Sequence, residues 1–178
     1  KFSIQSKEIL PNKLILNPIF TSTLNGKKSY CSIMDSLCQS IESLWSINNN
    51  SESSEYAIES ISLISKCLKN IEKLNDQNRK NLLLASNLSG KAINITKTTA
   101  PHALSYSFTS YNNLPHGHAV AVSSRFFLEY NYNLTEYDCN DKRGVSYVKS
   151  VFVDLFKILD VKTIKEARFK LEMFIADI

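Results

Sequence analysis

Apolar side chains in this 178-residue sequence recur at three- and four-residue steps from Lys28 almost to the C-terminus. That spacing places them on one face of a helix. The chain contains four glycines and four prolines, which is too few for the many turns of an all-β fold. We therefore predict an irregular all-α domain of about seven helices with almost no strand.

The composition excludes several other classes of protein. With 43% hydrophobic and 21% charged residues, the chain can bury a core and is not expected to be disordered. Its net charge of +4 comes from interspersed charges rather than from a basic cluster, so we expect no nucleic-acid partner. No apolar run approaches the roughly 18 residues of a membrane span, and no glycine-rich nucleotide-binding loop occurs.

The four cysteines fit no zinc or disulfide framework. Apolar helical patterns surround Cys31, Cys38 and Cys67, which indicates buried free thiols and a cytoplasmic location.

The first 25 residues differ from the rest. Leu14–Leu16 form a short apolar run between Pro11 and Pro18, and proline keeps the preceding backbone out of the helical region. We predict that residues 1–25 are an extended linker or strand end from an N-terminal domain not included here. Residues 26–178 would form the helical domain. The absence of an initiator methionine supports the interpretation that the chain is part of a longer polypeptide.

Cap residues and breaks divide the helical part. The first helix reaches Trp45, and Asn50 or Ser51 caps a second. Asp76 is expected to cap a third helix, and Pro101 to lie in the first turn of a fourth. The buried stripe of the second helix is predicted to contain Ala57, Ile58, Ile61, Ile64, Leu68, Ile71 and Leu74. Three further segments have helical periodicity: about 118–130, 145–159, and one opened by the capping box at 163–166.

The three histidines of the sequence, His102, His116 and His118, all fall within seventeen residues. Neutral imidazole binds borderline metals, and two helices joined by a short loop can direct such residues at one point. The alternative is a satisfied core histidine with two loop residues, because structural polar networks also gather these groups.

Asp35 and Gln39 form a second candidate element. They are four residues apart and therefore share one face of the first helix, beside its apolar stripe. A carboxylate in that position needs a partner or a metal. The alternative is a capping or solvated aspartate.

Together these elements resemble a known family. The segments MDSLCQSIESLW (34–45), PHALSY (101–106) and LPHGHAV (114–120) are similar to the iron-containing, group III alcohol dehydrogenases. The family pattern is D-A-L-x-H-x-I-E, then H-x-x-x-H, then P-H-G, and the spacing between His102 and His116 matches it. The segment PNKLILNP (11–18) resembles the P-x-x-x-x-x-D-P lead-in, with Asn17 in place of the aspartate.

The resemblance implies a set of roles. Asp35, His102 and His116 would bind a divalent metal, Fe²⁺ or Zn²⁺. Gln39 stands at the position of a fourth ligand that is normally histidine, which would weaken the site. Tyr106 replaces the second histidine of H-x-x-x-H and would be a catalytic proton relay. His118 has no role that the resemblance assigns.

The resemblance also implies a two-domain enzyme. A helical C-terminal domain holds the metal, and an N-terminal α/β domain binds NAD(P). The chain would then be the metal-side domain of a dehydrogenase that interconverts small aldehydes and alcohols. It would be inactive alone, and the parent could be a homodimer. Gln39 and Tyr106 look closest to the branch that contains phosphonoacetaldehyde reductases, where Lys91 or Lys97 could bind an anionic phosphonate.

Two alternatives stay open. One is a dehydroquinate-synthase-like or glycerol-phosphate dehydrogenase member of the same superfamily, for which Asp35, His102 and His116 suffice. The other is a metal-free helical interaction module that has lost catalysis, an interpretation favoured by Gln39 and Tyr106. A zinc hydrolase is disfavoured because the sequence has no H-E-x-x-H.

Overall fold

The computed structural model describes residues 6–24, 26–68 and 74–176, and every regular element within these ranges is a helix. Two short 3-10 helices, η1 (Lys7–Ile9) and η2 (Pro18–Thr21), come first. The α-helices are α1 (Gly26–Trp45), α2 (Ser51–Leu68), α3 (Asp76–Thr96), α4 (Ala100–Asn112), α5 (His116–Tyr132), α6 (Val145–Leu159) and α7 (Ile164–Ala176). The prediction of an all-α fold is confirmed.

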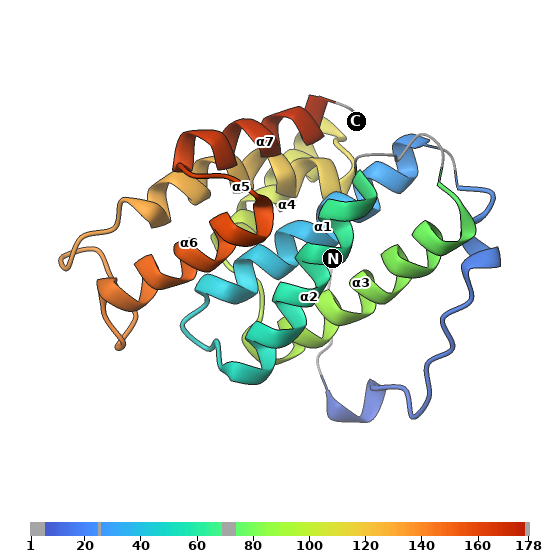
Figure 1. Ribbon diagram of the computed structural model, residues 1–178, viewed down its shortest axis with the longest axis horizontal. Coiled ribbons are helices and arrows are strands. Elements are labelled where there is room, and N and C mark those ends of the chain that lie inside the picture. Colours follow the sequence, from blue (N-terminus) through green and yellow to red (C-terminus); the bar gives the residue numbers. More distant parts are fainter. Residues whose placement is uncertain (1–5, 25, 69–73, 177–178) are drawn as a thin grey trace.

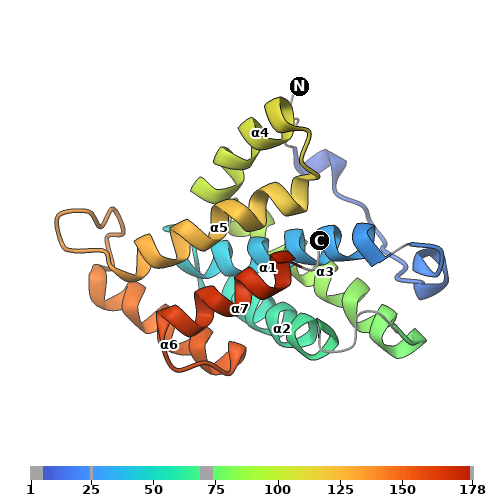
Figure 2. The same ribbon diagram turned by 90° about the horizontal axis from the view of Figure 1, so that it is seen from above.

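Helix α1 lies at the centre of the bundle, with α2 and α3 on one side and α5 on the other (Figures 1 and 2). Serines let these helices approach closely while keeping their own polar atoms bonded. Ser40 Oγ donates to Ser60 Oγ at 2.9 Å, and Ser60 Oγ donates to the Ala85 carbonyl at 2.9 Å. Because other helices pack against α1 on several sides, it is a rigid support for any side chain that it directs toward α4 and α5.

Large side chains fill the other part of the core, where α6 closes the bundle. The Trp45 and Phe152 rings stack with centroids 6.1 Å apart, and Tyr132 meets Phe152 edge-on at 5.4 Å. Helix α7 packs mainly on α5 (Figure 1). These contacts hold α5 between α1 and α7.

Most predicted helix boundaries agree with the structure. The segment 145–159 is α6, and Thr163 Oγ1 accepts from the Glu166 N–H as the capping box requires. The cap of α3 is Asn75 rather than Asp76, since Asn75 Oδ1 accepts from the Asn78 N–H at 2.8 Å.

The predicted stripe of α2 needs two corrections. Ile58 is 36% exposed, because it lies beside rather than within the row of Ala57, Ile61 and Ile64. Leu74 follows the helix instead of belonging to it, although it still packs on the core. Ile71, predicted in the same stripe, lies outside the described residues.

The N-terminal segment 6–24 crosses the surface without a strand in the described residues. Asn17 caps η2, accepting from the Ile19 N–H at 3.1 Å, a bond that an aspartate could also make. Asn17 therefore keeps the capping bond that an aspartate would make at this position. η2 packs against α3, while Ile15 and Phe20 are largely exposed.

All four cysteines lie in the described ranges, and none of them forms a disulfide. Cys38 and Cys67 are buried as predicted, whereas Cys31 is only half-buried. No described helix combines the length and apolar character that crossing a bilayer requires.

Candidate metal centre

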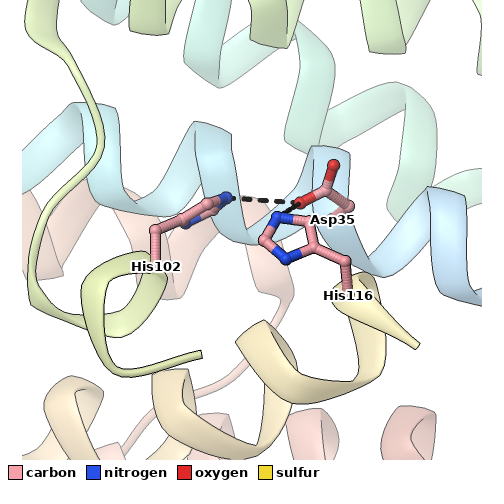
Figure 3. Close-up of side chains that lie close together, drawn as sticks. All are labelled: Asp35, His102 and His116. Atoms are coloured by element: carbon pink, nitrogen blue, oxygen red, sulfur yellow. Dashed lines mark hydrogen bonds and ion pairs between the residues drawn. The ribbon is translucent and has the colours of Figure 1, made fainter. Parts of the chain in front are cut away.

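Three separate helices bring Asp35, His102 and His116 together, as the sequence predicts. Asp35 lies on α1, His102 in the first turn of α4, and His116 at the first residue of α5 rather than in the preceding turn. Figure 3 shows the three side chains pointing toward one another. One potential ligand atom from each residue lies within 4.8 Å of the other two.

The carboxylate is the hub of this arrangement. Asp35 Oδ1 is 3.2 Å from His102 Nε2 and 3.7 Å from His116 Nε2 (Figure 3). The two imidazole rings meet edge-on, with centroids 5.5 Å apart. The side chain of His102 is almost fully buried, whereas those of Asp35 and His116 are 27% and 42% exposed. The centre therefore has a buried wall and one side open to solvent.

Gly117 explains why His116 can reach Asp35. A Cβ atom at this position would lie 1.8 Å from the Cys31 carbonyl oxygen and 3.3 Å from Asp35 Cβ. The start of α5 thus touches the backbone of α1, and only glycine fits this approach. The P-H-G motif combines a ligand candidate with the residue that permits its position.

Glu42 anchors the other histidine. This fully buried carboxylate lies on the same face of α1 as Asp35, two turns further on. Its Oε2 accepts from the Thr99 N–H at 2.6 Å and from the Thr99 hydroxyl at 2.8 Å. Its Oε1 makes a short hydrogen bond with His102 Nδ1. Glu42 therefore fixes the start of α4 and one nitrogen of His102, which leaves Nε2 facing Asp35.

The electrostatic environment of His102 favours positive charge. Burial alone lowers the pKa of His102, but hydrogen bonds with Asp35 and Glu42 and the charges of both carboxylates outweigh it and raise the pKa to about 9. The metal-free site therefore holds a proton where a metal cation could be held.

Gln39 lies beside Asp35, as its spacing predicts, but it presents the nitrogen of its amide. Gln39 Nε2 donates to Asp35 Oδ2 at 2.9 Å, and Gln39 Oε1 accepts from the Ser89 hydroxyl at 3.1 Å. The amide thus holds one carboxylate oxygen of Asp35, while Oδ1 faces the two imidazoles.

Tyr106 lies next to the centre. Its ring stacks on that of His116, with centroids 6.1 Å apart and planes at 16°, and the residue is 61% exposed. The lysines considered for a phosphonate have other partners: Lys91 Nζ lies 5.3 Å from the centre of the Tyr56 ring, and Lys97 Nζ donates to the Asn94 carbonyl. His118 is not among the three ligand candidates.

This donor set suits a divalent transition metal. One carboxylate and two imidazoles are hard-to-borderline ligands of the kind that Fe²⁺ and Zn²⁺ accept. The histidine orientations suit the same purpose, because a metal-binding histidine commonly donates its other N–H to a carboxylate, as His102 can to Glu42. The residues therefore fit the metal that the resemblance implies.

Sequence reasoning missed the roles of Glu42 and Thr99. One signal was present, since Asp35, Gln39 and Glu42 follow one another at four and then three residues on one helix face. The partner of Glu42 is 60 residues away along the chain, and that pairing appears only in the fold.

Two relatives with similar sequences are named as a reductase and a dehydrogenase. Phosphonoacetaldehyde reductase of Streptomyces viridochromogenes is 31% identical over 153 residues, covering 85% of this chain and 39% of the relative. The 1,3-propanediol dehydrogenase of Klebsiella pneumoniae is 30% identical over 133 residues, covering 74% of this chain and 34% of the relative. The chain thus spans less than half the length of these relatives.

Solved structures show the same fold. The iron-containing alcohol dehydrogenase of Thermococcus thioreducens superposes with a TM-score of 0.84 at 22% identity, over 98% of this chain and 44% of that one. Residues 30–174, which contain all three ligand candidates, match the profile described as Fe-containing alcohol dehydrogenase family, C-terminal. The chain belongs to the Fe-containing alcohol dehydrogenase family and corresponds to its C-terminal, all-helical region.

Proposed function

We propose that this chain is the metal-binding part of an NAD(P)-linked alcohol dehydrogenase that reduces small aldehydes. The observation that carries the proposal is the meeting of Asp35, His102 and His116 within 4.8 Å, from three helices of a chain in this family. A divalent ion bound by these residues would act as a Lewis acid that polarises the carbonyl of the aldehyde.

The protein's own residues would prepare the site. Asp35 supplies negative charge, and Gln39 occupies its second oxygen so that Oδ1 stays directed at the imidazoles. His116 and Tyr106 form the exposed side, where a substrate would enter. The Tyr106 hydroxyl could pass a proton between solvent and the product oxygen, which general acid catalysis requires.

We further propose that the nucleotide cofactor is bound mainly by a domain outside residues 1–178, joined through the segment 1–25. The cofactor carries the hydride, and the helical domain positions the carbonyl. On this proposal the present chain alone does not turn over. Oxidation of NAD(P)H by the purified chain with any aldehyde would refute that part.

Phosphonoacetaldehyde is the first substrate to test, because the relative of that name is 31% identical. Lys91 and Lys97 are both exposed and make only surface contacts, with the Tyr56 ring and the Asn94 carbonyl, so either could bind the phosphonate only by leaving that contact. 1,3-Propanediol is the uncharged comparison, tested in the reverse direction, in which the alcohol is oxidised and NAD(P)⁺ is reduced.

The experiment uses the full-length parent, loaded anaerobically with Fe²⁺ or with Zn²⁺. We expect aldehyde-dependent oxidation of NAD(P)H that Asp35→Asn reduces by at least about a hundredfold, with metal content reduced in parallel. Arg168→Met, on the surface of α7, is the control and should leave both unchanged. A parent that binds no metal and turns over no aldehyde would instead support the metal-free helical interaction module.

A further inference from the structure

We infer that Glu42 is a positioning residue that sets which nitrogen of His102 is free to bind the metal. The inference rests on the proposed metal centre and adds to it a residue that touches neither metal nor substrate. It depends on where the hydrogen-bond donors around Glu42 lie.

All of the groups described around the Glu42 carboxylate can donate. Oε2 receives the backbone N–H and the hydroxyl of Thr99, and Oε1 faces His102 Nδ1. The Thr99 hydroxyl is held in the donating orientation because its oxygen accepts from Trp45 Nε1 at 3.0 Å. A carboxylate can only accept, so His102 must present Nδ1 with its proton.

The proton on Nδ1 determines the state of the other ring nitrogen, Nε2. A neutral imidazole carries one proton, so a proton on Nδ1 leaves a lone pair on Nε2. Nε2 is the atom that lies 3.2 Å from Asp35 Oδ1, on the side of His116. Glu42 thereby directs the lone pair into the donor cluster.

The variant Glu42→Gln would reverse this order. If its amide oxygen takes the two Thr99 donors, its NH₂ group must face His102 Nδ1, which then has to accept. The ring proton would move to Nε2 and close the coordination position. The substitution conserves shape, so we expect the fold to survive and Zn²⁺ affinity to fall by about tenfold or more, the usual range for removing a carboxylate partner of a ligating histidine.

Thr99→Val is the matched control. It removes the hydroxyl that bonds to Glu42 and Trp45, yet it leaves the Thr99 N–H and the Glu42–His102 pair in place. If Glu42 serves only to anchor α4, both variants should weaken Zn²⁺ binding alike. If Glu42 sets the tautomer, Thr99→Val should lower thermal stability while its Zn²⁺ affinity stays within about threefold.

The test combines calorimetry with ¹⁵N NMR of the histidine rings in the Zn²⁺-loaded chain. We expect wild-type His102 to show a protonated Nδ1 and a metal-bound Nε2, and Glu42→Gln to lose the Nδ1–H signal. A wild-type His102 that binds Zn²⁺ through Nδ1 would overturn the inference even if Glu42→Gln does not fold. Equal Zn²⁺ affinity in wild type and Glu42→Gln, or equal losses in Glu42→Gln and Thr99→Val, would also overturn it.

Failure of the proposed function gives a different result. A wild-type chain that binds Zn²⁺ no better than His102→Ala would remove the metal centre and the role of Glu42 together. Normal wild-type binding that Glu42→Gln leaves unchanged would remove only the role of Glu42.

Discussion

The polar cluster around Asp35 joins α1 to α4 and α5, and the one around Arg143 joins the residues between α1 and α2 to the segment before α6, but the two clusters use charge differently. In the Arg143 cluster, the guanidinium donates to both oxygens of Asp141 and to the carbonyls of Asn49 and Ser46. Each of these acceptors faces an N–H, and the Asp141 side chain is only 6% exposed. All of these acceptors are therefore paired, as expected of a cluster that stabilises the fold.

The polar groups of the Asp35 cluster are not all paired in this way. Its hub oxygen faces two imidazole nitrogens, either of which can carry a lone pair, and its outer side is open to solvent. Among the described residues, the ion-pair partners of Asp35 are the two histidines, and no arginine or lysine pairs with it. The difference separates a cluster that holds the fold from one that can hold a cation.

The largest effect is expected from Gly117→Ala, which should separate His116 from the rest of the Asp35 cluster. The new methyl group would collide with the Cys31 carbonyl, so α5 must move away from α1 and take His116 from Asp35. We expect loss of Zn²⁺ binding by about a hundredfold and a decrease of about 3 kcal/mol in the free energy of unfolding. Calorimetry and urea unfolding measure the two quantities.

Gly90→Ala is the control for this prediction. Gly90 lies within α3, and a Cβ atom there would meet nothing within 4 Å. Its replacement should stabilise the helix by up to about 1 kcal/mol and leave metal binding unchanged. Normal Zn²⁺ affinity in Gly117→Ala would show that the close approach of α5 is not what assembles the site.

The second prediction concerns the pH dependence of Zn²⁺ binding at the Asp35 cluster. Because the pKa of His102 is raised to about 9, the metal-free residue is protonated at pH 7, and a metal must displace that proton. Zn²⁺ affinity should therefore rise by about tenfold per pH unit until the pH approaches 9. Titrations in two buffers of different ionisation enthalpy should detect about one proton released per ion at pH 7.

The same raised pKa fixes the sign of the effect on stability. The contribution of His102 to folding is complete below its ordinary pKa of 6.5 and is lost as the pH rises through about 9. Asp141 acts in the opposite direction: the Arg143 hydrogen bonds hold its pKa below the usual 3.8, so its contribution is lost as the pH falls into the acid range. His102→Ala should flatten only the alkaline limb of the metal-free stability curve. A metal-free chain whose stability is constant from pH 6.5 to 9 would contradict the assignment to His102.

The third prediction concerns the Arg143 cluster. Arg143→Met would leave a buried Asp141 and two backbone carbonyls without their donor, so we expect the free energy of unfolding to fall by about 2–3 kcal/mol. Zn²⁺ affinity should not change. Arg168→Met, which breaks pairs with Glu129 and Glu172 on the surface, should change stability little. Loss of Zn²⁺ binding in Arg143→Met would mean that the two clusters are coupled.

Local patterns predicted the helices because local physics decides them. Val145–Leu159 has a strong apolar stripe and begins after Gly144, and its predicted bounds are those of α6. Where two neighbouring residues could both cap a helix, as with Asn75 and Asp76, the sequence could not choose between them. Ile58 was placed wrongly because periodicity does not fix the width of a buried stripe.

The site divides in the same way. Asp35, His102 and His116 were selected as candidates from their residue types and their spacing in the sequence. The fold brings them together. The direction of a side chain depends on partners far along the chain: Ser89 orients the amide of Gln39, and Thr99 fixes the carboxylate of Glu42. Those partners come from α3 and from the start of α4, and no spacing in the sequence predicts them.

The smallest effect is expected from Gln39→His, which tests whether residue 39 can be a ligand. As a ligand, Gln39 would have to turn its oxygen toward the site and give up its bonds to Asp35 and Ser89. A histidine has no such conflict and would offer a fourth ligand atom beside the three candidates. We expect Zn²⁺ affinity to rise by about tenfold, or about 1.4 kcal/mol, and the visible spectrum of the Co²⁺-loaded chain to change. Unchanged affinity and an unchanged spectrum would mean that residue 39 stays outside the coordination sphere in both proteins, and that Asp35, His102 and His116 bind the metal without a ligand from this position.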